Sequence, residues 1–354
     1  MNRWLSLLTL AVMGGVVLGS DYTIKTIADV KDAHQYRDIV ISNLHVPAGV
    51  PLVLLGLQNA VVTFEGTTTF GYKEWKGHLM MFKGDNVTVT GSPGHLIHCG
   101  GERWWDGRGG LGGTKKPKFF EVRLNNSQII GLKIKNTPMH AISINHSNNL
   151  TVSNLDIDNL EGDWKGGHNT DGFNVYESKN VTIRNCTVNN QDDCIAVKSG
   201  IDLLFEDHYC SGGHGISIGS VGGRRDNIVE RATIRNCFIR NSVNGVRVKT
   251  VRKAIGRVTN VTFEDVTLAN ITQFGVTMIG NYNLAHGDPH GEPTGGVPIS
   301  GLVLKNVVGT VNPKGTNIWV YVTNATDWSW DIDVTGGTKT RTCEGFPDGM
   351  TPLC

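Results

Sequence analysis

Three aspartates, a histidine and two basic residues recur at a nearly constant interval in the middle of the chain. They lie in four short clusters: Asn169-Thr170-Asp171, Gln191-Asp192-Asp193, Gly213-His214-Gly215 and Arg247-Val248-Lys249. Asp171 and Asp192 are 21 residues apart, as are Asp193 and His214, and 33 residues separate His214 from Arg247. If each interval is one coil of a solenoid, successive coils lie about 4.8 Å apart and the clusters share one face. Such a face predicts a cleft that hydrolyses an acidic polysaccharide.

The carboxyl groups are the candidates for the chemistry itself. Glycoside hydrolysis needs one protonated acid and one base or nucleophile. Repulsion among Asp171, Asp192 and Asp193 is expected to raise the pKa of one of them. Adjacent residues of a strand face opposite sides, so Asp192 and Asp193 share a cleft only at a turn, which the preceding polar residues favour. The alternative is an acidic pair that merely caps a turn.

The histidine and the two cations complete the predicted site. His214 lies between two glycines, and we expect it to hydrogen-bond a carboxylate and not to act as the primary acid. Arg247 and Lys249 are two residues apart on a presumed strand, so both project from one face and suit a sugar carboxylate. A salt bridge to the aspartates is the alternative for this pair. No second histidine or cysteine has ligand spacing near His214, so neither a metal nor a cofactor is predicted.

The elements that position these clusters are short, repeated strands. Phrases such as Asn86-Val-Thr-Val-Thr, Asn149-Leu-Thr-Val-Ser and Asn180-Val-Thr-Ile-Arg are each followed by a second strand such as Ala141-Ile-Ser-Ile or Gly215-Ile-Ser-Ile. Repeats of about 20 to 33 residues built only from strands indicate a parallel β-helix, whereas a β-sandwich leaves the repeated phrases unexplained. Only residues 27–36 look helical, and a short helix there would cap the open N-terminal end.

Composition and the N-terminus indicate where the protein acts. The chain of 354 residues has 33 Lys and Arg against 32 Asp and Glu, which gives no reason to expect nucleic acid or a membrane as partner. Residues 1–20 contain Arg3, an apolar run over residues 4–18 and small residues, which together predict a secretory signal peptide. We therefore expect a secreted, monomeric protein with one catalytic domain over residues 21–354.

Secretion makes disulfides and glycans plausible. We expect the pairs Cys194–Cys210 and Cys343–Cys354. Cys99, Cys186 and Cys237 remain, and we expect at least one of them to be a buried free thiol. Nine Asn-x-Ser/Thr sequons are candidate glycosylation sites, although some start strands and are equally well explained as packed turn residues: Asn86, Asn125, Asn145, Asn149, Asn180, Asn185, Asn260, Asn270 and Asn324.

The four clusters, in this order and at these intervals, resemble the motifs of the polygalacturonases, glycoside hydrolase family 28. The flanking sequences resemble the fungal-type endopolygalacturonases in particular: Thr67-Thr-Thr-Phe-Gly-Tyr-Lys-Glu-Trp, Arg103-Trp-Trp-Asp-Gly, Lys116-Pro-Lys-Phe-Phe and Cys210-Ser-Gly-Gly-His-Gly-Ile-Ser-Ile-Gly-Ser-Val-Gly-Gly. The resemblance extends over residues 39–354. It departs from the fungal pattern in lacking a cysteine pair before Cys99 and an evident basic cleavage site after the signal peptide.

The resemblance implies a right-handed parallel β-helix that hydrolyses α-1,4 bonds inside de-esterified homogalacturonan, the acidic backbone of pectin, by an inverting single displacement. It implies that Asp192 is the general acid and that Asp171 and Asp193 position and deprotonate water. It also places Tyr282 against the substrate. Asn169 is expected to hold the Asp171 turn and to contact the sugar.

Other activities fit the same residues. They are an exo-polygalacturonase, a rhamno- or xylogalacturonan hydrolase, a calcium-dependent pectate lyase and a non-catalytic pectin-binding paralogue. Three tryptophans could be sugar-stacking platforms, but packing of loops onto the coils is the better interpretation for them: Trp75, Trp104 and Trp105.

Overall fold

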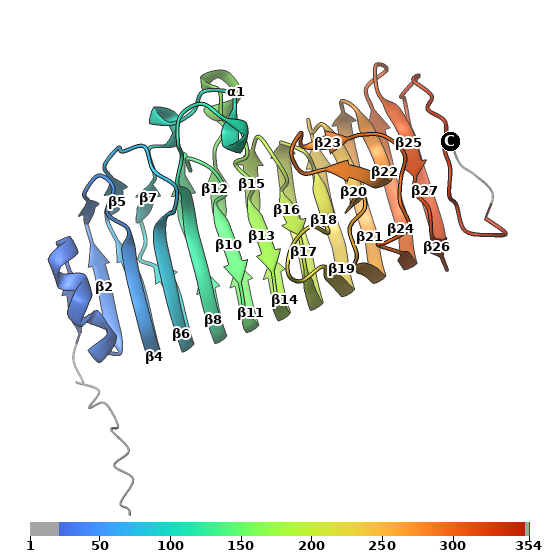
Figure 1. Ribbon diagram of the computed structural model, residues 1–354. Coiled ribbons are helices and arrows are strands. Elements are labelled where there is room, and N and C mark those ends of the chain that lie inside the picture. The colour runs from blue at the N-terminus through green and yellow to red at the C-terminus, as the bar shows by residue number, and fades with distance from the viewer. Residues whose placement is uncertain (1–20, 351–353) are drawn as a thin grey trace, which may run out of the picture.

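The computed structural model describes residues 21–350 and 354, and these form one continuous stack of parallel coils (Figure 1). The predicted signal peptide lies outside the described residues. The architecture is a right-handed parallel β-helix, which confirms the fold expected from the repeats. No helix in the described part of the chain is long and apolar enough to span a bilayer.

One ladder of mostly short strands carries the clusters singled out above. Its members pair in parallel from β8 onward. They are β8 (Lys118–Ile130), β10 (Ile142–Asn145), β13 (Phe173–Tyr176), β16 (Ile195–Val197), β18 (Ile216–Val221), β20 (Asn244–Val251), β22 (Phe274–Asn283) and β25 (Thr316–Tyr321). We call it the site ladder.

The other strands close the coils around the core. A second ladder runs through β1 (Tyr22–Ile24), β2 (Asp38–Ser42), β4 (Leu52–Glu65), β6 (His78–Gly91), β8, β11 (Asn148–Ser153), β14 (Ser178–Arg184), β17 (Gly200–Gly212), β19 (Ile228–Arg240), β21 (Arg257–Ile271), β24 (Ile299–Val311) and β27 (Ser329–Thr335). Shorter strands form a third: β3 (His45–Val46), β5 (Thr67–Phe70), β7 (Leu96–His98), β9 (Lys133–Lys135), β12 (Asp156–Asp158) and β15 (Thr187–Asn190). Two further two-residue strands are β23 (Asp288–Pro289) and β26 (Ala325–Thr326).

The core is a column of stacked aliphatic and aromatic side chains. Along the site ladder, Ile142, Phe173 and Ile195 pair in register, and each is at most 2% exposed. Because side chains alternate along a strand, burying these residues turns their neighbours outward, to the face that carries the clusters. A one-residue slip would bury the polar face, so the apolar column fixes the register of the site.

The N-terminal end of the column is covered by the 3-10 helix η1 (Ile27–Gln35), close to the predicted position. Its Ala33 is fully buried, and Ile27 and Val30 pack against the core. A capping box between Thr26 and Asp29 begins the helix. The expected end cap is therefore present.

Asparagines in the left-handed conformation form bends within the coils. Asn86 (φ 54°), Asn149 (φ 55°) and Asn180 (φ 52°) belong to this group, which the short polar asparagine side chain tolerates well. Stacked members bond to one another: Asn180 Nδ2 donates to Asn149 Oδ1 at 3.2 Å, and Asn149 Nδ2 donates to Asn126 Oδ1 at 3.0 Å. These sequon asparagines serve as turn residues, which was one of the two interpretations left open.

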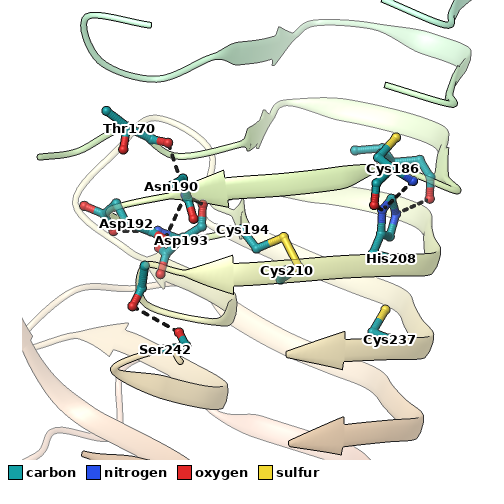
Figure 2. The surroundings of a disulfide bond; sticks show 12 residues. Thr170, Cys186, Asn190, Asp192, Asp193, Cys194, His208, Cys210, Cys237 and Ser242 are labelled. Carbon is teal, nitrogen blue, oxygen red and sulfur yellow. Dashed lines mark hydrogen bonds between the residues drawn. A yellow bond between two sulfur atoms is a disulfide. The ribbon is translucent and has the colours of Figure 1, made fainter. Parts of the chain in front are cut away.

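Both expected disulfides are present. Cys194 lies directly before β16 and is bonded to Cys210 of β17, beside the Asp192-Asp193 turn (Figure 2), and Cys343 is bonded to Cys354. The other three cysteines, Cys99, Cys186 and Cys237, are buried and unpaired among the described residues. The first bridge thus ties the turn that holds two of the aspartates to the neighbouring coil.

The tryptophans pack as expected. Trp104 and Trp105 are 1% and 8% exposed, and their indole N–H groups donate to the carbonyls of Lys73 and Thr137. They follow the short 3-10 helix η2 (Gly101–Arg103) and anchor the loop that continues into η3 (Gly109–Leu111). A single turn of helix, α1 (Gly162–Lys165), projects from the same side of the stack (Figure 1).

Candidate active site

The three aspartates meet at the start of two adjacent strands of the site ladder. Phe173 of β13 pairs with Ile195 of β16, and Asp171 and Asp193 each lie two residues before these partners. The two carboxylates therefore occupy equivalent places on neighbouring coils. All three aspartates are buried, with exposures of 2 to 8%.

The adjacent pair shares the cleft because the chain bends between β15 and β16. The backbone N–H of Asp193 donates to Asp192 Oδ1 at 2.7 Å. The buried amide of Asn190 donates to three carbonyls, those of Thr170 (3.1 Å), Asp192 (2.9 Å) and Asp193 (3.0 Å). One side chain thus fastens both aspartate turns together, which explains how consecutive aspartates can face the same side.

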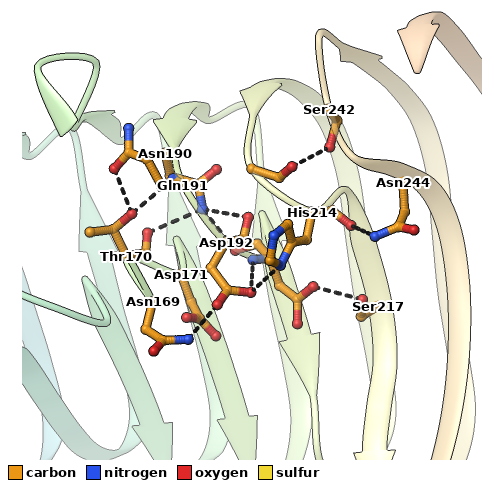
Figure 3. A network of polar contacts seen from close by, with 12 residues as sticks. Asn169, Thr170, Asp171, Asn190, Gln191, Asp192, His214, Ser217, Ser242 and Asn244 are labelled. Carbon is orange, nitrogen blue, oxygen red and sulfur yellow. Dashed lines mark hydrogen bonds and ion pairs between the residues drawn. The ribbon is translucent and has the colours of Figure 1, made fainter. Parts of the chain in front are cut away.

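Asp192 is held from two directions (Figure 3). Asn169 Nδ2 donates to its Oδ2 at 2.6 Å, and His214 Nδ1 lies 3.0 Å from its Oδ1. Asn169 was expected to hold the Asp171 turn, but its amide binds Asp192, and its Oδ1 accepts from the N–H of Gly110 at 2.9 Å. The contact of His214 with a carboxylate is as expected.

The glycine before His214 is required by the close approach of two coils. Gly213 has φ 61°, and a Cβ there would lie 2.1 Å from the carbonyl oxygen of Asp192. Any side chain would push the His214 turn away from the aspartates. The glycine therefore sets the distance between the imidazole and its carboxylate.

The two cations of β20 both bind Asp193. Arg247 Nη2 lies 2.6 Å from Asp193 Oδ1, and Lys249 Nζ lies 2.8 Å from Oδ2. Ser217 Oγ also donates to Oδ1 at 2.8 Å and accepts from Arg247 Nε. The salt bridge considered as an alternative is thus formed. It leaves the cations at the cleft surface, where a sugar carboxylate could compete for them.

Tyr282 stands beside these cations. Lys249 Nζ lies 5.2 Å from its ring centroid, within the range of a cation–π contact. Burial raises the pKa of the Tyr282 phenol to about 12, so it remains a neutral hydrogen-bond donor. Tyr282 lines the same cleft as the aspartates.

The cleft has a volume of about 670 Å³ and is bordered by two loops. One carries Leu111, and the other is the hairpin between β22 and β23. A Cβ placed on Gly287 of the hairpin would lie 4.0 Å from Leu111 Cδ1, so the two loops nearly touch across the cleft. His168 also lines the cleft and has no bonded partner for Nδ1 among the described residues.

The charges in the cleft separate the pKa values of the aspartates. Burial, together with the negative charges of Asp192 and Asp193, raises the pKa of Asp171 to about 7. Burial also acts upward on Asp192, but His214, Lys249 and Arg247 hold its pKa well below the ordinary value. One carboxyl with a raised pKa was expected, and it is Asp171.

Several polar residues of the cleft were missed from the sequence. His140 Nε2 lies 3.6 Å from Asp171 Oδ1, and burial, with Lys198 and Lys118 nearby, lowers its pKa well below the usual value. Lys118, Lys198 and Arg224 also line the cleft. His140 immediately precedes a repeated strand phrase and Lys198 follows one, so extending the repeats by one residue would have found both.

Asp192, Asp193 and His214 bring three possible metal-ligand atoms within 4.8 Å of one another. Both oxygens of Asp193 already bind Arg247 or Lys249, and these cations would repel a divalent ion at the same place. The donor set therefore suits proton transfer better than metal binding.

Comparison with known proteins places this geometry among carbohydrate-active enzymes. The family model described as "Glycosyl hydrolases family 28" matches residues 37–352. Endopolygalacturonase 1 of Colletotrichum lindemuthianum is 49% identical over 319 residues, 89% of this chain and 87% of that protein. Endopolygalacturonase B of Emericella nidulans is 48% identical, over 90% and 88% of the two chains.

Solved structures agree in fold. Endopolygalacturonase I from Stereum purpureum, solved with two galacturonates, superposes with a TM-score of 0.81 at 34% identity, covering 89% of this chain and 94% of that chain. The endo-xylogalacturonan hydrolase of Aspergillus tubingensis has the same fold, with a TM-score of 0.68 at 22% identity, covering 93% of this chain and all of that one.

Proposed function

The chain belongs to glycosyl hydrolases family 28, and on this premise we propose that it is an endo-polygalacturonase that cuts α-1,4 bonds within de-esterified homogalacturonan. The observation that carries the proposal is the pairing of Arg247 and Lys249 with a carboxylate, Asp193, beside Asp192. Cations placed next to catalytic carboxyls suit a uronic acid at the point of cleavage, because they can bind its carboxylate, which a neutral sugar lacks.

In the proposed reaction, Asp192 protonates the glycosidic oxygen that leaves. Asp171 and Asp193 orient a water molecule and take its proton as it attacks the anomeric carbon from the opposite face, so the product is inverted. His214 holds Asp192 through its imidazole, and Asn169 holds the second oxygen. Tyr282 contacts the substrate beside Lys249.

Asp192 must gain a proton to act as the acid, because His214, Lys249 and Arg247 hold its pKa well below the ordinary value. The substrate itself supplies the change. Its carboxylate, bound by Arg247 and Lys249, offsets the part of the lowering that these two cations cause, while the contact with His214 remains. Substrate binding therefore moves the pKa of Asp192 upward and prepares it for catalysis.

We extend the proposal to the setting of the enzyme: it is secreted through the N-terminal signal and works as a monomer on the pectin of cell walls. The near contact of Leu111 with the β22–β23 hairpin favours one alternative, exo action, because a covered cleft accepts chain ends more easily than chain interiors. The sizes of the products distinguish endo action from exo action.

The test uses calcium-free polygalacturonic acid with the wild type and Asp192→Asn. We expect rapid loss of viscosity and a mixture of oligomers from the wild type, with product of inverted configuration by proton NMR, and a rate at least about 10³-fold lower for the variant. Monomer alone would establish exo action, and no cleavage of any pectic polymer would leave only a binding role.

The role of each aspartate is tested with an activated substrate. An aryl galacturonide with a good leaving group needs no acid, so it should restore the rate of Asp192→Asn and leave Asp171→Asn inactive. The opposite result would make Asp171, which holds the proton in the free protein, the general acid.

A further inference from the structure

Two aromatic rings form the wall of the cleft near the C-terminal end of the stack. Phe274 begins β22 and Trp319 lies in β25, and both line the cleft although they are only 6% and 8% exposed. Their ring centroids are 5.1 Å apart, and the ring planes are inclined by 28°. Strands β22 and β25 follow β16 by three and four coils, which is about 14–19 Å along the axis. The rings therefore belong to the cleft but stand away from the aspartates.

The guanidinium of Arg341 packs against both rings. Its Cζ lies 5.0 Å from the ring centroid of Phe274 and 4.7 Å from that of Trp319, within the range of a cation–π contact. Arg341 is an exposed residue and does not itself line the cleft. It therefore supports the rings without facing a ligand in the cleft.

Arg341 reaches the rings from a segment that follows the last long strand. We call residues 336–344 the C-terminal strap. The backbone N–H groups of Lys339 and Glu344 donate, at 3.0 and 2.9 Å, to carbonyls just before β25 and near its end, and Glu344 also pairs with β25 in parallel. The strap thus runs along the edge of the last strand of the site ladder, and Arg341 lies between its two attachments.

A disulfide fastens the far end of the strap. Cys343 is bonded to Cys354, and Cys343 Sγ also accepts a backbone N–H of β25 at 3.2 Å. Cys343 packs against the same cluster of side chains as Phe274 and Trp319. Because the bridge lies two residues beyond Arg341, it limits how far the guanidinium can move from the rings.

We propose that the C-terminal strap is a positioning element of the cleft. Arg341 fixes the orientation of Phe274 and Trp319, and the disulfide of the strap keeps Arg341 against them. Loss of the guanidinium or of the bridge frees the rings to turn into the space that the polymer occupies. The inference rests on the proposed function only in taking polygalacturonate as the ligand. It predicts a change in the affinity for the polymer and not in the chemical step, because the rings stand several coils from the aspartates.

The first test measures hydrolysis of polygalacturonate by Arg341→Met, which removes the charge and keeps an unbranched side chain. We expect KM to rise about fivefold and kcat to change less than about twofold, because the contacts with two rings are lost and the reacting groups are untouched. Arg341→Lys should restore most of the affinity, since an ammonium also binds aromatic faces. Lys339→Met, at an exposed position of the same strap, is the matched control and should leave both constants unchanged. An unchanged KM in Arg341→Met, or a fall in kcat alone, would overturn the positioning role.

The contribution of the disulfide is tested with Cys354→Ala, which opens the bridge and leaves Cys343 beside β25. This variant should raise KM about as much as Arg341→Met does. Combining the two substitutions should cause little further increase, because both act through the same rings. Independent, multiplying increases in KM would overturn the link between the bridge and Arg341.

A third measurement needs no substrate and so separates this inference from the proposed function. In protein labelled with 5-fluorotryptophan, the fluorine resonance of Trp319, assigned with Trp319→Phe, should shift in Arg341→Met and in Cys354→Ala and stay in place in Lys339→Met. An unmoved resonance in Arg341→Met or Cys354→Ala would overturn the inference even in an active enzyme. Shifted resonances in a protein that cleaves no pectic polymer would support the positioning role and refute only the proposed function.

Discussion

At the scale of single residues, the three aspartates of the site differ in their partners. Asp192 and Asp193 are each bound by several polar groups, and Asp171 is not. Asp193 has two cations and a hydroxyl, and Asp192 has an imidazole and an amide. Asp171 receives one hydrogen bond, from Asn174 Nδ2 to its Oδ2 at 3.1 Å, while its Oδ1 has no bonded partner among the described residues. Burial, together with the charges of Asp192 and Asp193, raises the pKa of Asp171, and the single bond from Asn174 offsets little of this effect.

Asp171 should therefore make stability depend on pH. Its folded pKa is about 7 against an ordinary 3.8, so the folded state binds the proton more tightly than the unfolded state. The resulting stabilisation is complete below about pH 4 and is lost as the pH rises to about 7. Asp171→Asn has no carboxyl to ionise at this position, so the variant does not lose stability in this way. The free energy of unfolding of the variant minus that of wild type should therefore increase between pH 4 and 7, by up to about 4 kcal/mol.

Urea unfolding at pH 4, 5.5 and 7 measures the effect. Asp333→Asn, at an exposed position of β27 that does not line the cleft, is the matched control and should show no such trend. Parallel pH dependences for Asp171→Asn and wild type would mean that Asp171 is ionised in the folded protein throughout this range.

At the scale of elements, the site ladder and the loops differ in how far sequence could predict them. The clusters could be placed because every coil repeats the same strand phrase, and the apolar column then fixes which residues face the cleft. The partner of Asn169 could not be predicted, because Asp171 and Asp192 lie on adjacent coils and only the orientation of the amide decides between them. Lys198 and His140 were predictable in principle, since each lies one residue beyond a repeated strand.

The two loops over the cleft are outside the repeat, and their contact has no signal in the sequence. The loop before β8 is shaped by Lys116, whose buried ammonium lies 2.8 Å from Asp106 and donates to the carbonyls of Gly109 and Thr114. The hairpin of β22 and β23 leans back over the stack until Leu284 reaches Gly223 (Figure 1). Each conformation depends on contacts that bring distant residues together.

These loops must separate before the interior of a polymer can enter the cleft from the side. Linking Leu111→Cys to Gly287→Cys by a disulfide should therefore lower the rate of viscosity loss of polygalacturonate at least about tenfold, while trigalacturonate, which can enter from an end, is still hydrolysed. A reductant should restore the polymer activity of the double variant. Gly287→Cys alone controls for the strain of a side chain at φ 74°. Unchanged polymer activity in the oxidised double variant would show that the loops do not obstruct entry.

At the scale of the whole molecule, a coil stack has two ends, and each would expose apolar side chains and unpaired strand groups unless it were covered. The N-terminal end is covered by β1, which pairs with β2, and by η1 above the core. The sequence revealed this cap because it is the one segment with a helical pattern before the strand repeats begin. The active site lies several coils away, so the cap contributes to solubility and stability and not to catalysis.

Ala33→Asp tests whether the cap contributes to stability and solubility without affecting catalysis. The Ala33 side chain lies on the inner face of η1 and is fully buried, so a carboxylate there must either be desolvated without a partner or lift the helix from the end of the stack. We expect a loss of about 2–4 kcal/mol in the free energy of unfolding, and aggregation through the uncovered apolar end of the stack on mild heating. The soluble fraction should keep the kcat of wild type, because the register of the site ladder is set by contacts between its own coils. His34→Asp, at the exposed neighbouring position, is the control. A fall in kcat for folded Ala33→Asp would mean that the end of the stack and the cleft are coupled through the column of core side chains.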